Sequence, residues 1–147
     1  MVRRPHHTGF TVADLERTIE FYRDGLGLQV ANRIPGPKAY HSDVTGYADC
    51  HLEIAFMSVP NGPPVEFIEY KNPQGPALDM ETYRPGNGHL AFVVDDLKAT
   101  IEKLTKLGGT PRSKAPIEVP SGPNKGATFV YLRDPDGITL ELFEFSG

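Results

Sequence analysis

The sequence has only one cysteine, Cys50, among its 147 residues, so no disulfide can form within the chain. A chain without disulfides suits a reducing compartment, and we expect a cytoplasmic protein. No apolar run comes near the ~20 residues that a membrane-spanning helix needs, and no apolar signal-peptide core follows Met1. The net charge is −4 without a basic cluster, which argues against nucleic acid and membrane surfaces as partners. A small-molecule substrate is therefore the expected partner.

The sequence does contain an internal repeat. A Pro-Asn-Gly turn leads into a strand-like stretch with Glu66, and a Pro-Asp-Gly turn leads into a similar stretch with Glu141, 75 residues later. His7 and His89 lie 82 residues apart, and an Asp-Leu pair follows each of them at the same spacing. Because a chain of this length forms about one ordinary domain, we expect the two copies to pack together.

Both copies have the same expected order of elements, β-α-β-β-β. We therefore expect an α+β fold, a single domain in which two tandem βαβββ modules form a cupped mixed sheet. The modules span residues 1–72 and 89–147, a linker rich in Gly and Pro spans 73–88, and residues 35–49 form a polar loop. The expected helices are 15–26 and 97–107, and the expected strands are 6–13, 28–34, 51–59, 65–70, 89–95, 112–119, 127–133 and 138–145.

The alternation of side chains along the strands points to a metal site. Glu66 and Glu141 each stand between two apolar residues, so both carboxylates face away from the helices. His7 and His89 also point to the face opposite to that of the apolar residues in their strands, since they are an odd number of positions away from them. If the copies pack about a pseudo-twofold axis, two imidazoles and two carboxylates meet in one cavity. This set suits one divalent ion, Zn²⁺, Ni²⁺, Co²⁺ or Mn²⁺, with Fe²⁺ as the alternative.

The walls of this cavity are expected to be partly apolar, and the loop 35–49 is expected to act as a lid or wall. Tyr40 and His41 lie in this loop, His51 follows it, and Tyr70 ends a strand, which makes these four residues candidates for the substrate pocket. Cys50 is expected to be a buried spectator. The apolar residues assigned to the cavity are Ala55, Met57, Val130 and Leu132.

The residues described so far carry a resemblance. The duplicated βαβββ pattern, the openings at His7 and His89, and the Asp-Pro-Asp-Gly turn before Glu141 resemble the vicinal oxygen chelate superfamily over essentially the whole chain. That superfamily includes glyoxalase I, methylmalonyl-CoA epimerase, extradiol dioxygenases, fosfomycin-resistance enzymes and bleomycin-binding proteins. The set of His7, Glu66, His89 and Glu141 is similar to the metal ligands of glyoxalase I. Epimerases usually carry Gln at the place of Glu66, and extradiol dioxygenases bind Fe²⁺ through two His and one Glu.

The resemblance implies a metal-dependent lyase or isomerase similar to lactoylglutathione lyase. The metal would chelate two neighbouring oxygens of a small carbonyl substrate, and a carboxylate would remove a proton to give an enolate or enediolate. We expect Glu141 to be the base and Glu66 the returning acid or second base. Members that use glutathione commonly carry Arg and Asn where this sequence has Thr11 and Tyr70, so the sequence does not indicate glutathione.

Other members of the superfamily supply the alternative functions. They are an Fe(II) extradiol-type dioxygenase, an isomerase like methylmalonyl-CoA epimerase, and a metal-free drug-binding protein. In similar proteins the site closes either within one chain or between two chains, and we expect a homodimer. The sequence leaves open the substrate, the metal and which glutamate is the base.

Overall fold

The structure is a computed structural model that describes residues 1–146. Its internal contacts divide the chain into two compact units, Met1–Ala77 and Leu78–Gly147, and each unit is described by itself. Within the described residues, no helix is long and apolar enough to cross a membrane.

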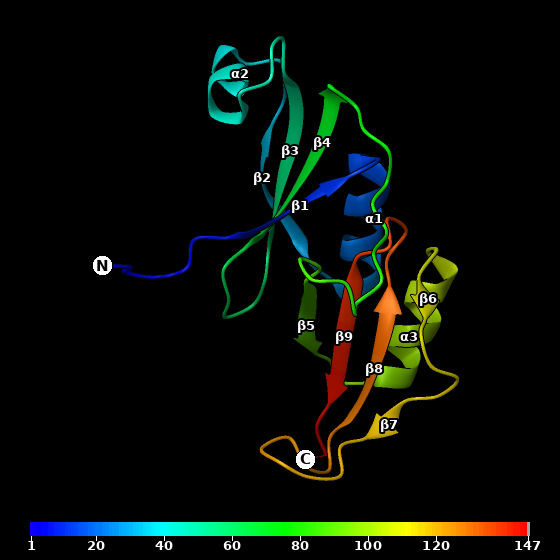
Figure 1. Cartoon of the computed structure of the whole chain (residues 1–147). Coiled ribbons are helices and arrows are strands. Elements are labelled where there is room, and N and C mark those ends of the chain that lie inside the picture. Colours follow the sequence, from blue (N-terminus) through cyan, green and yellow to red (C-terminus); the bar gives the residue numbers. More distant parts are fainter. Residues whose placement is uncertain (147) are drawn as a thin grey trace. The chain divides into compact units, whose positions relative to one another are not determined.

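The first unit is a four-stranded mixed sheet with one long helix against it (Figure 1). The strand order is β1-β4-β3-β2, in which β1 and β4 are parallel and the other neighbours are antiparallel. The elements are β1 (Thr8–Val12), α1 (Leu15–Leu26), β2 (Gln29–Ile34), α2 (Ala39–Thr45), β3 (His51–Ser58) and β4 (Val65–Asn72).

The second unit repeats this plan. Its strand order is β5-β9-β8-β6, with β7 also paired to β8, and again only the first pair, β5 and β9, is parallel. The elements are β5 (His89–Val93), α3 (Leu97–Lys106), β6 (Thr110–Pro111), β7 (Ile117–Glu118), β8 (Thr128–Arg133) and β9 (Thr139–Glu144). The expected α+β class and the duplicated strand-helix-strand order are confirmed.

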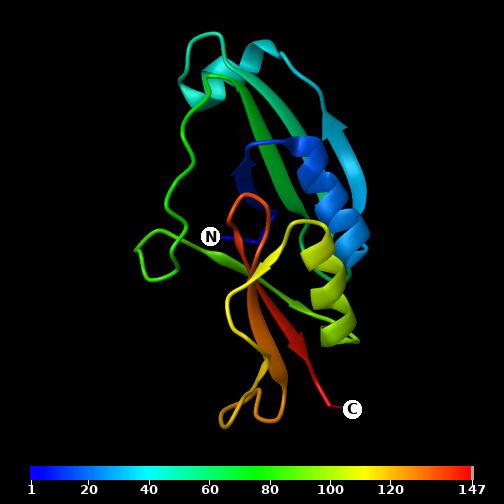
Figure 2. The same cartoon turned by 90° about the vertical axis from the view of Figure 1, so that its right-hand side faces the viewer.

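Each long helix lies on one face of its own sheet (Figure 2), as the apolar pattern of the strands requires. In the first unit α1 packs on β3 and β4, and Val65 and Phe67 are buried on that face. In the second unit α3 packs on β8 and β9, and Leu140 and Leu142 are completely buried. We call the other side of each sheet, the side away from the helix, its open face.

An aspartate caps the start of each long helix. Asp14 accepts a hydrogen bond from the backbone N–H of Arg17 at 3.0 Å, and Asp96 accepts one from Ala99 at 2.8 Å. The helix α1 ends at Gly27, whose φ of 76° is left-handed and therefore favours glycine.

Two expectations about the connections are wrong. The segment 35–49, expected to be a loop, contains the short helix α2, which ends at Gly46 with φ 76°. The strand expected at 112–119 is reduced to the two-residue strand β7, and the two-residue strand β6 lies just before that range. Proline explains the second difference, because Pro111, Pro116 and Pro120 lack the N–H that a continuous ladder needs.

The second half of the expected linker folds onto the second unit. Glu81 accepts a hydrogen bond from Arg112 at 2.9 Å and forms an ion pair with Arg133 at 3.0 Å, and Arg133 donates a hydrogen bond to the carbonyl oxygen of Met80 at 3.1 Å. The boundary between the compact units follows Ala77, within the expected linker 73–88, and these contacts explain why the rest of the linker belongs to the second unit.

Candidate functional site: two histidine-glutamate pairs

The first unit brings His7 and Glu66 together on its open face. His7 precedes β1 and Glu66 is the second residue of β4, the parallel neighbour of β1. The imidazole Nε2 lies 3.2 Å from the carboxylate Oε2, and the side chains are 34% and 13% exposed. Gly9 is the register partner of Glu66, and a Cβ there would lie only 3.0 Å from Oε2. The glycine therefore leaves the room in which Glu66 reaches His7.

The second unit contains the same pair. His89 Nε2 lies 3.3 Å from Glu141 Oε2, with side chains 45% and 15% exposed. Glu141 is opposite Ala91 in the register of β5 and β9, just as Glu66 is opposite Gly9. The two pairs are thus built by equivalent positions of the repeat, each with a small residue across from the glutamate.

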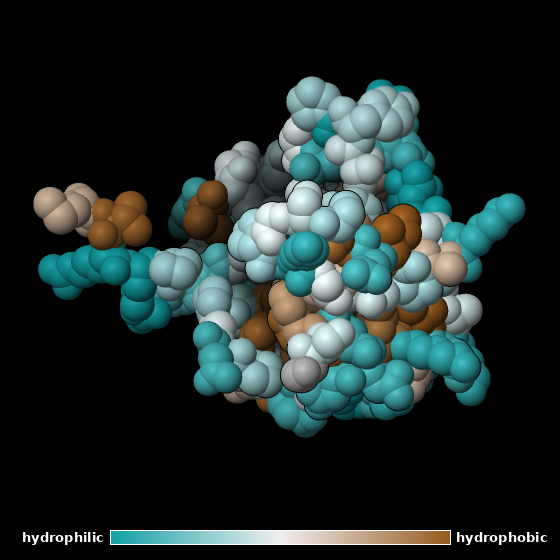
Figure 3. Space-filling view, turned by 90° about the horizontal axis from the view of Figure 1, so that it is seen from below, coloured by the Kyte–Doolittle hydropathy of each residue, from teal (hydrophilic) through white to brown (hydrophobic). Residues whose placement is uncertain are grey.

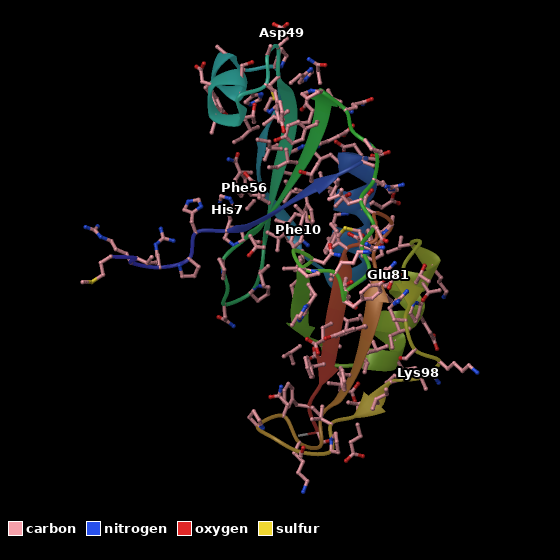
Figure 4. The ribbon with its side chains drawn as sticks, in the orientation of Figure 1. His7, Phe10, Asp49, Phe56, Glu81 and Lys98 are labelled. Atoms are coloured by element: carbon pink, nitrogen blue, oxygen red, sulfur yellow. The ribbon has the colours of Figure 1, made fainter. Side chains whose placement is uncertain are left out.

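An aromatic ring completes each pair. Phe56 is the register partner of Glu66, and its ring centroid lies 5.5 Å from that of His7 (Figure 4). Tyr131 is the register partner of Glu141, and its ring centroid lies 5.7 Å from that of His89. Burial and, second, the charge of Glu141 raise the pKa of Tyr131 above its ordinary value. Tyr131 is therefore neutral and can donate a hydrogen bond.

The donor set of each pair fits a divalent metal ion. An imidazole and a carboxylate are the ligands that ions such as Zn²⁺, Ni²⁺, Co²⁺ and Mn²⁺ take in proteins. His7 already turns its Nε2 toward the carboxylate, while its Nδ1 lies 2.7 Å from Nδ1 of His6. Within residues 1–146 no group of three or more potential ligand side chains comes together, so each unit by itself offers two protein ligands.

Three of the four polar pocket candidates make their contacts apart from these pairs, whereas burial and, to a lesser extent, the charge of Glu66 raise the pKa of Tyr70. His41 is completely buried, and its Nδ1 accepts a hydrogen bond from the backbone N–H of Leu52 at 3.2 Å. Tyr40 is 50% exposed, with its ring 4.8 Å from that of His41. Tyr70 is the register partner of Leu52, and burial is the main reason that its pKa is raised.

His51 belongs to a different ion pair, which has no counterpart at the equivalent positions of the second unit. Its Nε2 lies 3.0 Å from Oε1 of Glu53, which also accepts from the N–H of Gly36 at 3.2 Å. The hydrogen bond with His51 is the main cause that lowers the pKa of Glu53.

An open crevice of about 510 Å³ lies beside the short helix α2. His51 lines this crevice, but none of the four residues of the histidine-glutamate pairs does. We place the chemistry at the pairs rather than at the crevice, because volume alone supplies neither metal ligands nor a base. The lining residues are Pro37, Lys38, Ala39, Ser42, Asp49, Cys50, His51 and Asn72.

The face assigned to Met57 from the sequence is wrong. Met57 pairs with Val65, is completely buried, and lies on the face that α1 covers. The same correction applies to Ala55, and to Val130 and Leu132 in the second unit, all of them buried. The residues that share the open face with the glutamates are instead Phe56 and Ile54 in β3 and Tyr131 and Phe129 in β8.

Sequence reasoning missed Phe56 and Tyr131, although a signal for them exists. The two aromatic residues are 75 positions apart, the same spacing as Glu66 and Glu141. Gly9 and Ala91 were also missed, and they share the 82-residue spacing of the two histidines. A search for small and aromatic residues at the repeat spacings would have found all four.

The duplicated architecture and the two pairs define a class of protein, the α+β proteins built from tandem βαβββ modules. The chain belongs to the Glyoxalase/Bleomycin resistance protein/Dioxygenase superfamily, whose family model matches residues 4–142. The resemblance noted from the sequence is thereby confirmed.

Several curated relatives match nearly the whole chain. A protein from Haemophilus influenzae named lactoylglutathione lyase is 31% identical over 140 residues, which cover 94% of this chain and 90% of the relative. A protein of the same name from Salmonella typhimurium is 31% identical over 144 residues, covering 94% and 90%.

Solved structures show the same fold. A glyoxalase family protein from Bacillus cereus superposes with a TM-score of 0.87 at 24% identity, covering 100% of this chain and 97% of the other. A fosfomycin resistance protein from Listeria monocytogenes, solved with Mn(II) and sulfate, has a TM-score of 0.66 at 17% identity, with 99% and 95% covered.

Proposed function

We propose that the protein is a divalent-metal-dependent enzyme that moves a proton on a small carbonyl substrate with two neighbouring oxygens. The observation that carries the proposal is the pair of imidazole and carboxylate, which recurs at equivalent register positions in both units. In each unit an imidazole and a carboxylate, the side chains that such ions bind, are turned toward each other on the open face of the sheet. Each pair supplies only half of a four-ligand set, so the second copy would complete it.

His7, Glu66, His89 and Glu141 would hold the metal, as the donor chemistry of the two pairs supports. When bound, a divalent ion supplies a positive charge that polarises the carbonyl and stabilises the developing enolate. Two largely buried carboxylates would gain from such a cation, because their charges would otherwise repel each other wherever the pairs meet. The pairs would meet within one chain or between two, and we propose a homodimer.

The glutamates would also carry the proton. A carboxylate close to the α-carbon of the substrate would accept the proton at one oxygen, and a second, protonated carboxyl group would donate a proton to the neighbouring carbon or oxygen, with exchange with water restoring both groups. We assign the base to Glu141 and the returning acid to Glu66. The neutral phenol of Tyr131 beside Glu141 supports different roles for the two glutamates, since Phe56 beside Glu66 has no hydrogen to donate.

The relatives named lactoylglutathione lyase support a lyase of this kind and make hemithioacetals the first substrates to test. Thr11 and Tyr70 stand where glutathione-dependent members of the superfamily commonly have Arg and Asn. Hemithioacetals of thiols other than glutathione, and α-chiral thioesters, therefore belong in the same screen.

Metal analysis of four proteins tests the proposal. Wild type, Glu66→Gln, Glu141→Gln and Glu53→Gln are purified without a tag or chelator, and their metal content and affinity are measured. Glu53 is the matched control, because it also faces a histidine at 3.0 Å but has no repeat. We expect the first two variants to lose at least about 100-fold in metal affinity, since changes outside the ligands already cost 10–100-fold. The control should bind metal like wild type.

The other outcomes separate the alternatives. Iron that is retained by Glu66→Gln, together with cleavage of a catechol, would replace the proposal with an extradiol-type dioxygenase. Wild-type protein that binds no divalent ion, even after incubation with each candidate metal, would leave a metal-free binding protein. An equal loss of metal in all three variants, Glu53→Gln included, would show that the repeated pairs are not its ligands.

A further inference from the structure

The row of side chains next to each histidine-glutamate pair is apolar. In the first unit this row lies two residues along each strand from the row that contains Glu66. It consists of Thr11 in β1, Ile68 in β4 and Ile54 in β3, which are register partners. Ile34 of β2 continues this row as the partner of Ile54. Ile34, Ile68 and Phe56 are only partly buried and pack against the cluster that contains Ile54.

The second unit has an apolar row at the equivalent place. Val93, Phe143, Phe129 and Ile117 are register partners across four strands. The rings of Phe129 and Phe143 stack with centroids 5.4 Å apart and an interplanar angle of 17°. Phe145 stacks on Phe143 at 6.0 Å and is itself 47% exposed.

These rows remain partly open to solvent. Val93 is 68% exposed and Ile117 is 55% exposed, although apolar side chains of this size are usually covered. The space-filling view shows hydrophobic residues reaching the surface between hydrophilic ones (Figure 3). We call the four residues of each unit its apolar row.

We propose that the two apolar rows bind a hydrocarbon or aromatic substituent of the substrate, so that the substrate class is a vicinal-oxygen compound with an apolar tail. This inference rests on the function proposed above, because it takes the reacting oxygens to lie at the histidine-glutamate pairs. Each row begins two residues from its glutamate, so a group attached to the reacting carbon meets the row directly.

The chemistry of the rows favours such a tail over a charged one. Neither row contains a charged side chain, and the only hydroxyl is that of Thr11 at an end of the first row. A peptide such as glutathione brings two carboxylates and an ammonium group, which would lose water on these rows without gaining partners. A methylene or phenyl group instead gains from burial against isoleucine and phenylalanine.

Binding of hydroxamates to the metal-loaded protein tests the inference. Hydroxamates present two neighbouring oxygens, so acetohydroxamate, butanohydroxamate, hexanohydroxamate and benzohydroxamate differ only in the tail. Titration calorimetry on protein loaded with Zn²⁺ gives their dissociation constants. We expect the affinity to rise about two- to fourfold per added methylene, the range that partial to full burial of a methylene supplies.

Matched variants locate the tail. Ile68→Ala and Phe143→Ala shorten one half-buried side chain in each row, and Val44→Ala shortens a side chain on α2 that is 72% exposed. We expect the two row variants to bind hexanohydroxamate about tenfold more weakly while acetohydroxamate binds as in wild type. Unchanged acetohydroxamate binding also shows that the site is still folded. The Val44→Ala control should leave the whole series unchanged.

The outcomes separate this inference from the function on which it rests. Acetohydroxamate binding without any gain from longer tails would overturn the inference and leave the metal-dependent enzyme in place. Failure of every hydroxamate to bind protein that contains metal would overturn both. Row variants that change the mass in sedimentation, but not the dependence on tail length, would show that the rows form an interface between copies instead.

Discussion

The small residue opposite each glutamate is the feature on which both pairs depend at the scale of single residues. Gly9 and Ala91 occupy the positions where a larger side chain would press on the carboxylate. At Gly9 the nearest atom is the end of the Glu66 side chain, so an added side chain displaces the carboxylate rather than the backbone.

Replacing Gly9 by valine should therefore impair the metal site without unfolding the first unit. Valine suits a strand, but its Cβ would lie 3.0 Å from Oε2 of Glu66 and push it away from His7. We expect the metal affinity to fall about 10–100-fold, as for other changes next to a ligand, with competition against a chromophoric chelator as the measurement. Gly75→Val is the control, because no atom lies within 4 Å of a Cβ there. Equal affinities in both variants would contradict a role for Glu66 as a ligand.

The pair of His51 and Glu53 predicts a dependence of stability on pH. The folded state lowers the pKa of Glu53 from 4.5, chiefly through the hydrogen bond with His51, so the stabilisation is present above that value. It is lost as the pH falls through the lowered pKa of the folded state. The difference in free energy of unfolding between wild type and Glu53→Gln should therefore shrink between pH 6 and pH 3 in urea titrations. A difference that stays constant over this range would show that the contact adds nothing.

The sequence predicted the glutamates and histidines of the pairs but not their neighbours, and the reason is register. Parity within one strand places Glu141 opposite to Leu140 and Leu142, because side chains alternate without exception there. Which residues of two neighbouring strands share a face depends on how the hairpin aligns the strands, and a shift of the register by one residue moves every side chain to the other face. Met57 was assigned to the wrong face because its alignment with Val65 is fixed by the turn between them, not by the composition of β3.

At the scale of the elements, a glutamate fixes the start of each long helix to the adjacent sheet. Glu69 of β4 accepts a hydrogen bond from the N–H of Leu15 at 3.0 Å, and Glu144 of β9 accepts one from Leu97 at 2.6 Å. Free N–H groups and the helix dipole both favour a carboxylate at this place. These residues also follow the repeat, since they are 75 positions apart.

Removing either carboxylate should destabilise the protein without affecting the metal. Glu69 is buried and is also paired with Lys71, so Glu69→Ala leaves both an N–H and an ammonium group without their partner. We expect losses of about 1–3 kcal/mol for Glu69→Ala and for Glu144→Ala, the usual range for a charged hydrogen-bond partner. The exposed Glu102 of α3 provides the control Glu102→Ala, which should change stability by no more than about 0.5 kcal/mol. Urea unfolding measures all three, and equal stabilities would show that Glu69 and Glu144 are dispensable.

The long elements were predictable and the short ones were not, for a physical reason. The helix at Leu15–Leu26 has an aspartate before it, a regular apolar stripe and a glycine after it, three signals that agree. The seven-residue helix α2 has none of them except Gly46, and no side chain of Lys38 caps its start. Its formation depends on tertiary contacts, such as the hydrogen bond between Leu52 and His41, which a sequence does not display.

At the scale of the whole molecule, the two units predict a definite metal stoichiometry. Each unit offers one imidazole and one carboxylate, and a firmly held ion of this class takes at least three protein ligands. If two units share one ion, as proposed above, the ratio is one ion per chain whether the units belong to one chain or to two. Elemental analysis of protein of known concentration should give this ratio, and two ions per chain would mean that each pair binds by itself.

The shared ion also predicts that metal stabilises the whole chain rather than one half of it. A ligand at 100 times its dissociation constant adds about 2.7 kcal/mol to the free energy of unfolding. If both units hold the ion, either His7→Ala or His89→Ala should remove most of this gain, although the two histidines lie in different compact units. Thermal unfolding with and without Zn²⁺, on wild type and both variants, makes the comparison. A variant that keeps about half of the gain would show two independent weak sites, because a single ion coordinated by both units would lose most of its stabilising effect when either histidine is removed.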